Sequence, residues 1–357
     1  MSKKKSNTYW FISVPAEGKK TVVLENLKSK LPADLAEVDQ FIIPEFKIGT
    51  LDALVVISDE LVKYDQYFES AVMRIVDILR NLKDDINNNL VVNDKSVDQY
   101  LKTFQWDTMK FRADKSMQEI AEILNQEVTR IDNTMKSKLS SYNQVKGNLQ
   151  ALERKQTNIA DVVKKEHFVV DSNWLNKYET LVQFVVPRSS QKIAEDEEYG
   201  LFTVTLFKRV SEDFRHKCRE EKFVVREFQY NENEMANQRK EFEEVGATEK
   251  ELYNSLLRLS SANFGEVFSA WIHLKALRVY VESVLRYGLP PDFMSAMIKP
   301  KYKMEKKIRE VLIVQYGKLG GTLGKDASKD IIEEYHNLVD TDYYPYVWFQ
   351  IKFDVFK

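Results

Sequence analysis

The sequence is poor in glycine, proline and cysteine. Its 357 residues include 11 glycines, 8 prolines and a single cysteine, Cys218. Because glycine and proline supply many tight turns, their scarcity argues against a turn-rich sandwich or barrel and against a Gly/Pro-rich disordered chain. One cysteine excludes a disulfide framework within the chain and is typical of a reducing compartment. With only four histidines, few side chains could bind a soft metal ion.

An excess of charge and a long apolar run are also missing. The 53 basic and 55 acidic side chains leave a net charge of −2, so no global field attracts nucleic acid or an anionic membrane. No apolar run approaches the ~18 residues that a membrane span needs. The apolar run at residues 9–14 is too short for a signal peptide. We therefore expect a soluble, cytosolic protein that is not membrane-embedded and binds no nucleic acid.

The sequence does contain a long stretch that permits helix. Between Pro44 and Pro187 there is no proline and there are only two glycines. Over residues 117–152, apolar residues recur on average every 3.5 positions, which is the period of a helix packed along one seam. These positions are Met117, Ile120, Leu124, Val128, Ile131, Met135, Leu139, Tyr142, Val145, Leu149 and Leu152.

A second helical stripe covers about residues 233–287. It ends at Gly288, which suits a left-handed helix cap, and at Pro290-Pro291, which forbids continuation. Two helices of this length need each other as packing partners. The simplest arrangement is an antiparallel neck with a distal lobe inserted between its helices.

Strand-like segments lie in the inserted lobe and near both termini. In the lobe, residues 181–187, 201–207 and 223–228 favour strands, and residues 211–222 favour helix.

Near the termini, residues 9–15 and 347–356 favour strands that would pair in one sheet. Helices at about residues 50–86 and 302–317 would cover that sheet.

Together these segments predict a helix-rich α+β fold with the form of an elongated dumbbell. A discontinuous foot is expected from residues 1–115 and 288–357. A long antiparallel helical neck is expected from residues 116–158 and 233–287, and a small mixed α/β head from residues 159–232. The chain length agrees with two domains.

Motifs that could carry chemistry are incomplete. The loop at residues 317–326, GKLGGTLGKD, lacks the first glycine and the final Ser or Thr of a phosphate-binding P-loop. His216 and Cys218 are two residues apart on a predicted helix, so their side chains point in different directions. The chain has no second cysteine that could complete a zinc site. The acidic run at residues 195–198 is more typical of a solvated turn than of an acid–base pair. His273 beside the apolar stripe is expected to be packed. We predict a protein without catalytic residues, metal or cofactor.

A basic cluster follows the second long helix. A solvated helix start would explain it, and an acidic protein partner or a lipid surface is the alternative. Its members are Lys299, Lys301, Lys303, Lys306, Lys307 and Arg309.

The segment WIHLKALRVYVESVLRYGLPPDF (271–293) resembles a signature of the C subunit of the vacuolar-type proton-pumping ATPase (V-ATPase). Further segments are similar to this family in the same order, so the resemblance spans nearly the whole chain. They are residues 44–52, 104–107, 147–155, 185–190, 194–209, 213–232 and 343–347.

The resemblance implies a peripheral subunit with a head, a neck and a foot at the junction of the cytosolic catalytic sector and the membrane sector. The head would bind one peripheral stalk, made of the E and G subunits. The foot would contact a second stalk and the cytosolic N-terminal part of the membrane-sector a subunit. Such a stator makes no bond and pumps no proton, but it keeps the catalytic hexamer from rotating with the rotor. It would act on the cytosolic face of vacuolar, endosomal or lysosomal membranes.

The resemblance also implies that the protein leaves the complex when the enzyme reversibly disassembles. Some family members are reported to bind actin filaments, so an actin-binding cytoskeletal linker is the alternative function.

For the head, charged contacts with an acidic stalk are expected from cations within the matched segments. Phe104 and Trp106 are expected to pack at the base of the neck. The candidate head cations are Arg188, Lys208, Arg209, Arg215 and Arg219.

The head departs from the family pattern. The family has more residues after residues 153–155, and a further strand between residues 169–172 and 177–181. Here residues 173–176, Asn-Trp-Leu-Asn, bridge that gap directly. One head strand is therefore expected to be missing, which bears directly on stalk binding by the head.

Overall fold

The chain divides into two compact units. Unit 1 comprises Met1–Leu139 and Tyr253–Lys357, and unit 2 comprises Ser140–Leu252. The α+β, helix-rich class is confirmed, because helices predominate and the sheets are small and antiparallel. The computed structural model describes residues 7–86, 89–161, 174–195, 200–223, 225, 232–320 and 344–353.

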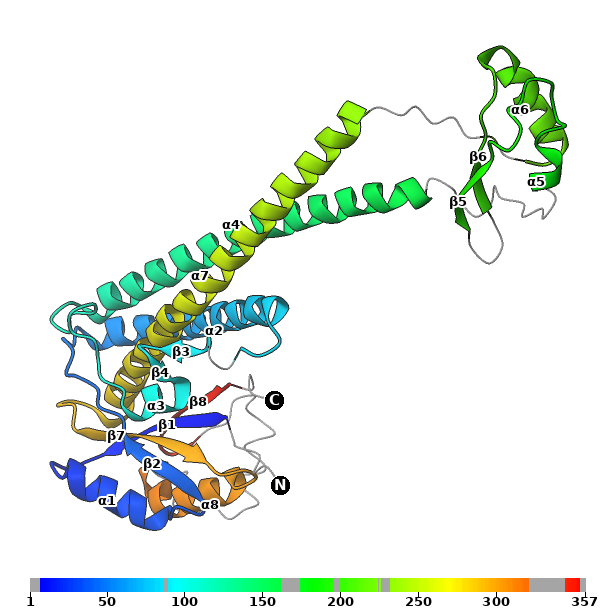
Figure 1. The fold of residues 1–357 in the computed structure, drawn as a ribbon. Coiled ribbons are helices and arrows are strands. Elements are labelled where there is room, and N and C mark those ends of the chain that lie inside the picture. The colour runs from blue at the N-terminus through cyan, green and yellow to red at the C-terminus, as the bar shows by residue number, and fades with distance from the viewer. Residues whose placement is uncertain are drawn as a thin grey trace. The chain divides into compact units, whose positions relative to one another are not determined.

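A four-stranded antiparallel sheet lies in unit 1 (Figure 1). Strand β1 is central: Phe11 lies opposite Met297 of β7 on one side and Phe349 of β8 on the other. The predicted pairing of the first and last strands is thereby confirmed. The strands, in spatial order, are β2 (Ala36–Gln40), β7 (Phe293–Pro300), β1 (Thr8–Pro15) and β8 (Val347–Lys352).

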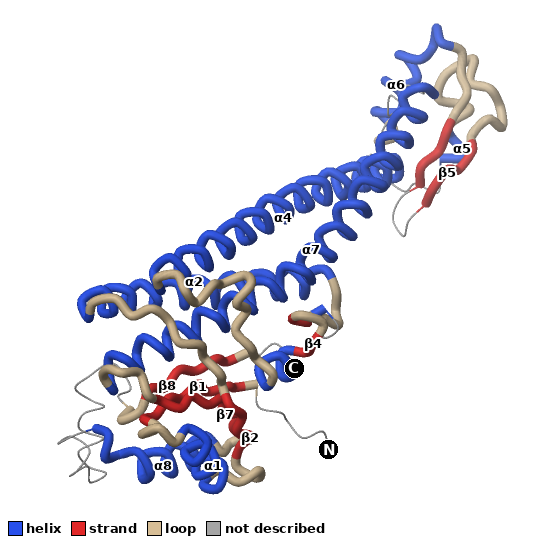
Figure 2. The backbone as a smooth tube through the Cα atoms, turned by 90° about the vertical axis from the view of Figure 1, so that its left-hand side faces the viewer, coloured by secondary structure: helices blue, strands red, loops and turns tan. Residues whose placement is uncertain are grey.

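One face of the sheet packs against helices α1 (Lys20–Lys30) and α8 (Glu305–Tyr316), as Figure 2 shows. Because side chains alternate along a strand, Trp10 and Ile12 point to this face. They share a core with Leu27 of α1 and with α8. The helix expected near residues 302–317 is therefore confirmed.

The opposite face packs against the C-terminal part of α7 (Glu232–Tyr287) rather than against the predicted helix near residues 50–86. The Tyr287 hydroxyl donates to the Ser13 carbonyl oxygen at 2.6 Å, and the Ser283 hydroxyl donates to Ser13 Oγ at 2.7 Å. Nearly every side chain over residues 264–284 of α7 is buried. A helix that is buried nearly all round must be covered on both sides.

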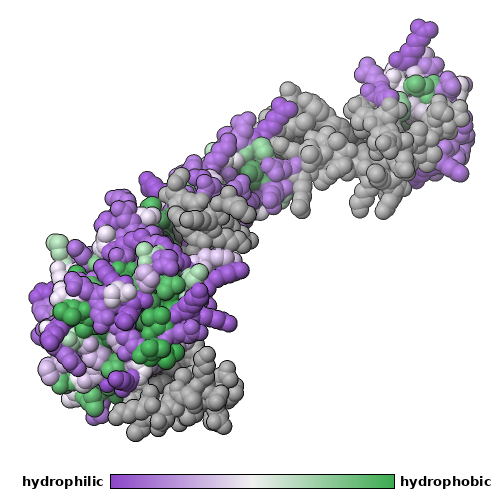
Figure 3. All heavy atoms as spheres, turned by 90° about the horizontal axis from the view of Figure 1, so that it is seen from below, coloured by the Kyte–Doolittle hydropathy of each residue, from purple (hydrophilic) through white to green (hydrophobic). Residues whose placement is uncertain are grey.

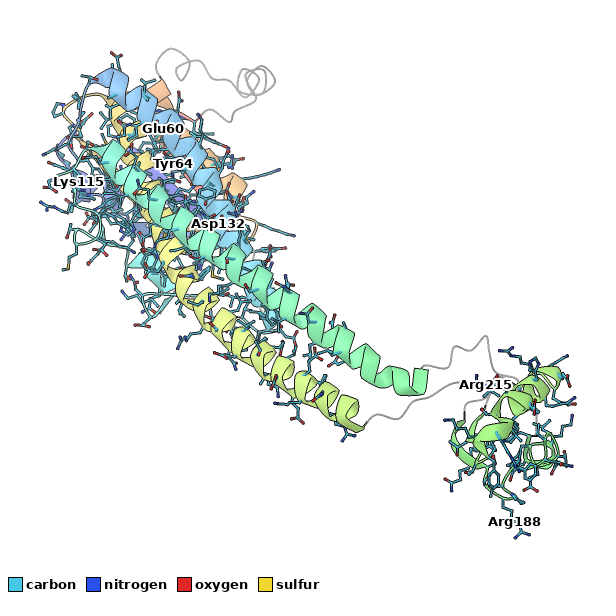
Figure 4. The ribbon with its side chains drawn as sticks, turned by 90° about the horizontal axis from the view of Figure 1, so that it is seen from above. Glu60, Tyr64, Lys115, Asp132, Arg188 and Arg215 are labelled. Carbon is cyan, nitrogen blue, oxygen red and sulfur yellow. The ribbon has the colours of Figure 1, made fainter. Side chains whose placement is uncertain are left out.

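Helices α2 (Leu51–Leu82) and α4 (Met117–Asp161) form a further layer with α7 in unit 1. The buried carboxylate of Asp132, labelled on α4 in Figure 4, accepts hydrogen bonds from Tyr67 and Arg74 of α2 at 3.2 and 2.9 Å. The seam predicted for α4 is buried as far as Met135 and again at Tyr142, apart from half-buried Leu139.

Unit 2 has a small core and a two-stranded sheet among its described residues. The predicted helix over residues 211–222 is confirmed as α6 (Ser211–Glu220). The other elements are α5 (Trp174–Lys177), β5 (Gln191–Glu195), β6 (Gly200–Thr203), a 3-10 turn (Lys208–Val210) and parts of α4 and α7. The core residues are Tyr178, Val185, Phe214, Cys218 and Phe223.

The predicted strand over residues 181–187 is wrong. This segment contributes only an isolated bridge between Val185 and Leu206. Phe184 and Arg188 adopt φ angles of 73° and 58°, and a left-handed backbone cannot continue an extended strand. The strand predicted over residues 201–207 ends early, at Thr203.

The short connection at residues 173–176 supplies an aromatic side chain to the core of unit 2. The ring of Trp174 packs 4.9 Å from that of Phe223, and its Nε1 donates to Ser190 Oγ at 2.9 Å. Most of the strand predicted over residues 223–228 lies outside the described residues, and neither Phe223 nor Val225 is in a strand.

Substitution by alanine is expected to have opposite effects on stability at two helical glycines. A Cβ at Gly265 of α7 would lie 2.9 Å from the Val91 carbonyl oxygen, whereas a Cβ at Gly147 of α4 would meet nothing within 4 Å. We expect Gly147→Ala to raise the free energy of unfolding by about 0.5–1 kcal/mol. We expect Gly265→Ala to lower it by about 1–3 kcal/mol, because backbone must move. Thermal denaturation of both variants tests this, and shifts of the same sign would contradict it.

Candidate interaction surfaces

The described residues with reactive side chains are packed or isolated. Cys218 is buried in the core of unit 2, and this burial raises the pKa of its thiol to about 11. The thiol is therefore protonated at neutral pH, and it is the thiolate that reacts. His216 lies exposed on α6. No group of three or more His, Cys, Asp or Glu in the described part of the chain could hold a metal ion.

Two of the sequence motifs lie largely beyond what the structure describes. Only residues 317–320 of the Gly-rich loop and Glu195 of the acidic run are described. Among the described helices, none is long and apolar enough to cross a bilayer.

His273 is packed in an aromatic box, as expected. Its ring lies 5.1, 4.9 and 4.9 Å from those of Phe104, Trp106 and Phe111. Trp106 Nε1 donates to the Phe111 carbonyl oxygen at 2.6 Å. The predicted packing role of Phe104 and Trp106 is thereby confirmed.

The five candidate cations of unit 2 lie on three segments: the turn at Arg188, the 3-10 turn that holds Lys208 and Arg209, and α6. Figure 4 shows Arg188 well apart from Arg215 on α6. The half-buried Arg215 pairs with Glu212 at 3.4 Å, and Arg219 is exposed farther along the same helix. Arg188 is exposed on a turn, where its backbone N–H donates to Glu179 Oε1 at 2.7 Å.

Lys208 and Arg209 are both exposed in the 3-10 turn before α6. The guanidinium of Arg209 lies over the ring of Phe184, with 4.0 Å between its carbon and the ring centroid. The same carbon lies 5.9 Å from the centroid of Phe207. Phe184 and Phe207 belong to segments that sequence patterns assign to strands, so their rings would be expected in the core. The structure instead places both on the surface.

Half of the basic cluster in unit 1 is engaged within the chain. Lys299, with only 12% of its side chain exposed, pairs with Asp98 and lies over the ring of Tyr9. Lys301 pairs with Glu37. Hydrogen bonds from Lys102 and then from Lys301 lower the pKa of Glu37 to about 2.

Arg309 of the same cluster covers aromatic rings. Its guanidinium carbon lies 5.3 Å from the ring of Trp10, 5.1 Å from that of Tyr344 and 5.0 Å from that of Trp348. Lys303, Lys306 and Lys307 are exposed to solvent. The cluster that is continuous in sequence is therefore divided between internal contacts and a smaller exposed group at the start of α8.

The family model for the V-ATPase C subunit matches residues 9–347. The V-type proton ATPase C subunit, isoform 1, of Bos taurus is 42% identical over 373 residues, covering 96% of this chain and 97% of the relative. The protein of that name in Xenopus laevis has the same identity and coverage, and isoform 1-A of Danio rerio is 41% identical with the same coverage.

The aligned length of 373 exceeds the 357 residues of the chain, so the chain lacks positions that its relative has. A solved structure of the cytoplasmic N-terminal domain of the V-ATPase I subunit, a homologue of the a subunit, aligns with 12% identity and a TM-score of 0.22. That alignment covers 85% of this chain and 97% of the other, but the score is too low to indicate a common fold. The family model and the relatives agree along almost the whole sequence, and the chain belongs to the V-ATPase C-subunit family.

Proposed function

We propose that this protein is a non-catalytic stator subunit of a vacuolar-type proton-pumping ATPase. It would link the cytosolic catalytic sector to the membrane sector through the E–G stalks and the N-terminal part of the a subunit. The observation that carries the proposal is the similarity to the C subunit over 96% of the chain. The protein would act on the cytosolic face of vacuolar, endosomal or lysosomal membranes.

We further propose a discontinuous foot and an inserted head. The foot would comprise residues 1–115 and 288–357, the neck residues 116–158 and 233–287, and the head residues 159–232. In support, β1 pairs with both β7 and β8, so segments from the two ends of the chain share one sheet. Force applied to that sheet would be carried by many hydrogen bonds in parallel.

A stator needs at least two contacts that hold at once. Two moderate interfaces on one chain bind far more tightly together than either does alone, because the second contact forms at high effective concentration. Breaking one contact then releases the protein. Reversible disassembly would follow from this arrangement without any catalytic step.

The proposal is tested in cells that lack their own C subunit. We expect the chain to restore assembly of the complex and acidification of the organelle. Purified protein should also retain an E–G heterodimer in a pull-down. Assembly that fails at wild-type expression levels, together with no retention of E–G, would overturn the proposal.

Actin binding is a second candidate, supported by the three exposed cations of the divided cluster. F-actin is acidic at its surface, and Lys303, Lys306 and Lys307 are exposed near one another in sequence. We expect Lys303→Glu/Lys306→Glu/Lys307→Glu to reduce co-sedimentation with actin filaments and to leave E–G binding unchanged. Co-sedimentation equal to that of the wild type would remove these lysines from any actin site.

A further inference from the structure

Unit 2 carries an exposed pair of phenylalanine rings capped by an arginine. We call Phe184, Phe207 and Arg209 the aromatic–arginine patch. The two rings are 49% and 57% exposed and meet edge to face with 6.1 Å between centroids. Backbone hydrogen bonds hold their segments together: Phe207 N–H donates to the Phe184 carbonyl oxygen at 3.3 Å, and Val186 N–H to that of Thr205 at 2.9 Å.

The position of Phe184 has an energetic cost. A bulky side chain at a φ of 73° is uncommon and strained, and such strain persists only where surrounding structure imposes it. Here it directs a ring into solvent instead of into the nearby core. Figure 3 shows a small apolar area among hydrophilic side chains on unit 2. Phenylalanine and arginine are both enriched at protein–protein interfaces relative to the rest of the surface.

The charges around the patch indicate which partner it would bind. The two segments that form it, residues 184–188 and 205–210, contain the three cations Arg188, Lys208 and Arg209. One carboxylate, that of Glu179, contacts these segments by accepting from the Arg188 backbone N–H, so cations remain in excess within them. The guanidinium carbon of Arg209 lies 4.0 Å from the ring centroid of Phe184, and a guanidinium can donate hydrogen bonds to a carboxylate while it covers an aromatic ring. A complementary surface would offer an apolar side chain between the rings and a carboxylate to Arg209.

We propose that the aromatic–arginine patch is the docking surface of unit 2 for an acidic amphipathic segment of the E–G stalk. This inference rests on the proposed stator function and adds the residues and the chemistry of the contact. It differs from an interface of charge alone, because the phenylalanines supply the buried centre of the contact. The cations of α6, Arg215 and Arg219, lie outside it.

The experiment titrates purified E–G heterodimer into the full-length chain and its variants. We expect Phe207→Ala and Arg209→Glu each to weaken the interaction of unit 2 about tenfold or more. Arg209→Lys should weaken it less, because lysine keeps the charge but not the planar stack. Two matched controls, Leu175→Ala and Arg219→Ala, change an exposed apolar and an exposed cationic residue of the same unit and should bind within about twofold of the wild type.

Folding and location are checked independently. The thiol of Cys218 is buried in the core of unit 2, so protection from a thiol reagent shows that this core is intact in each variant. A photo-crosslinking amino acid at position 207 should form an adduct with E or G, and the same group at position 175 should not. This measurement separates unit 2 from any second E–G contact made by unit 1.

The outcomes distinguish the two proposals. Wild-type binding that survives both patch substitutions, with no adduct from position 207, would overturn the patch while leaving the stator function standing. Absence of wild-type binding, with failure to restore assembly, would overturn the stator function and the patch together.

Discussion

Asp65→Ala is expected to lower the free energy of unfolding by about 3–5 kcal/mol. The carboxylate of Asp65 lies at a buried junction of α2 and α7 in unit 1. Its Oδ1 accepts from Trp271 Nε1 at 2.7 Å, and its Oδ2 accepts from Lys275 Nζ at 2.8 Å and also from Arg278. Removing it leaves two cations without their shared counter-charge.

The expected loss of stability in Asp65→Ala is large because Lys275 is buried. Only 3% of its surface is exposed, and burial lowers the pKa of its ammonium group despite the opposing charge of Asp65. Lys275 also points towards the Gln350 carbonyl oxygen of β8, at 3.4 Å. The junction therefore connects α2, α7 and the C-terminal strand, and an uncompensated buried cation there destabilises all three.

The same helix provides a matched control. Asp77 of α2 pairs with Arg80 at 3.4 Å, and 62% of its side chain is exposed. Solvent screens such a pair, so Asp77→Ala should change the free energy of unfolding by no more than about 0.5 kcal/mol. Urea denaturation measures both variants. Equal, small effects would show that the Asp65 junction is not stabilising.

Wild-type stability is expected to fall by about 2–3 kcal/mol between pH 7 and pH 4.5 because of His273 alone. Burial lowers the pKa of this histidine from 6.5 to about 4. The hydrogen bonds agree with a neutral ring. Nε2 accepts from the Asp107 backbone N–H at 3.1 Å, and Nδ1 lies 2.7 Å from the Ser269 carbonyl oxygen, where it must donate.

The direction of the pH effect follows from proton binding. Above pH 6.5 the ring of His273 is neutral in both the folded and the unfolded state, so it does not lower the free energy of unfolding. As the pH falls through 6.5, His273 binds a proton in the unfolded state but not in the folded state, so the free energy of unfolding declines. The decline is complete once the pH is below the folded pKa of about 4. Nearby Asp107 opposes this shift of the pKa and Lys110 adds to it.

Two glutamine variants isolate this contribution. His273→Gln cannot titrate, so its free energy of unfolding should change less between pH 7 and pH 4.5, by about the 2–3 kcal/mol given above. His216→Gln, at an exposed position of α6, should keep the wild-type pH dependence. Urea denaturation at the two pH values provides the comparison. A His273→Gln profile parallel to the wild type would refute the neutral buried histidine.

Much of the architecture was predictable where local pattern and burial agree. The 3.5-residue spacing from Met117 predicted α4, and the stripe ending before Gly288 predicted α7. The aromatic segments at residues 9–15 and 347–356 predicted a paired first and last strand. In each of these segments the side chains facing the core recur with the period of the backbone itself.

Predictions failed where partners distant in sequence decide the outcome. The apolar segment at residues 181–187 has strand-like composition, but the left-handed backbone of Phe184 interrupts it and places that ring on the surface. Nor could sequence assign Lys299 to Asp98, which is 201 residues away. Charge alone does not determine which cations of the basic cluster and of unit 2 an internal carboxylate or an aromatic ring engages.

The sequence by itself determined the long helices, the terminal strands and, through its similarity to a family, the proposed role. Repeating apolar positions and family segments are local properties of the chain, so they can be recognised in the sequence before the fold is known. Tertiary structure decided that α7 rather than α2 covers the face of the sheet opposite α1 and α8. It also decided that Asp65 and His273 are buried among specific partners, and that Phe184 and Phe207 lie on the surface. These features depend on which segments meet in space, because burial and electrostatic pairing act between residues that are far apart in sequence.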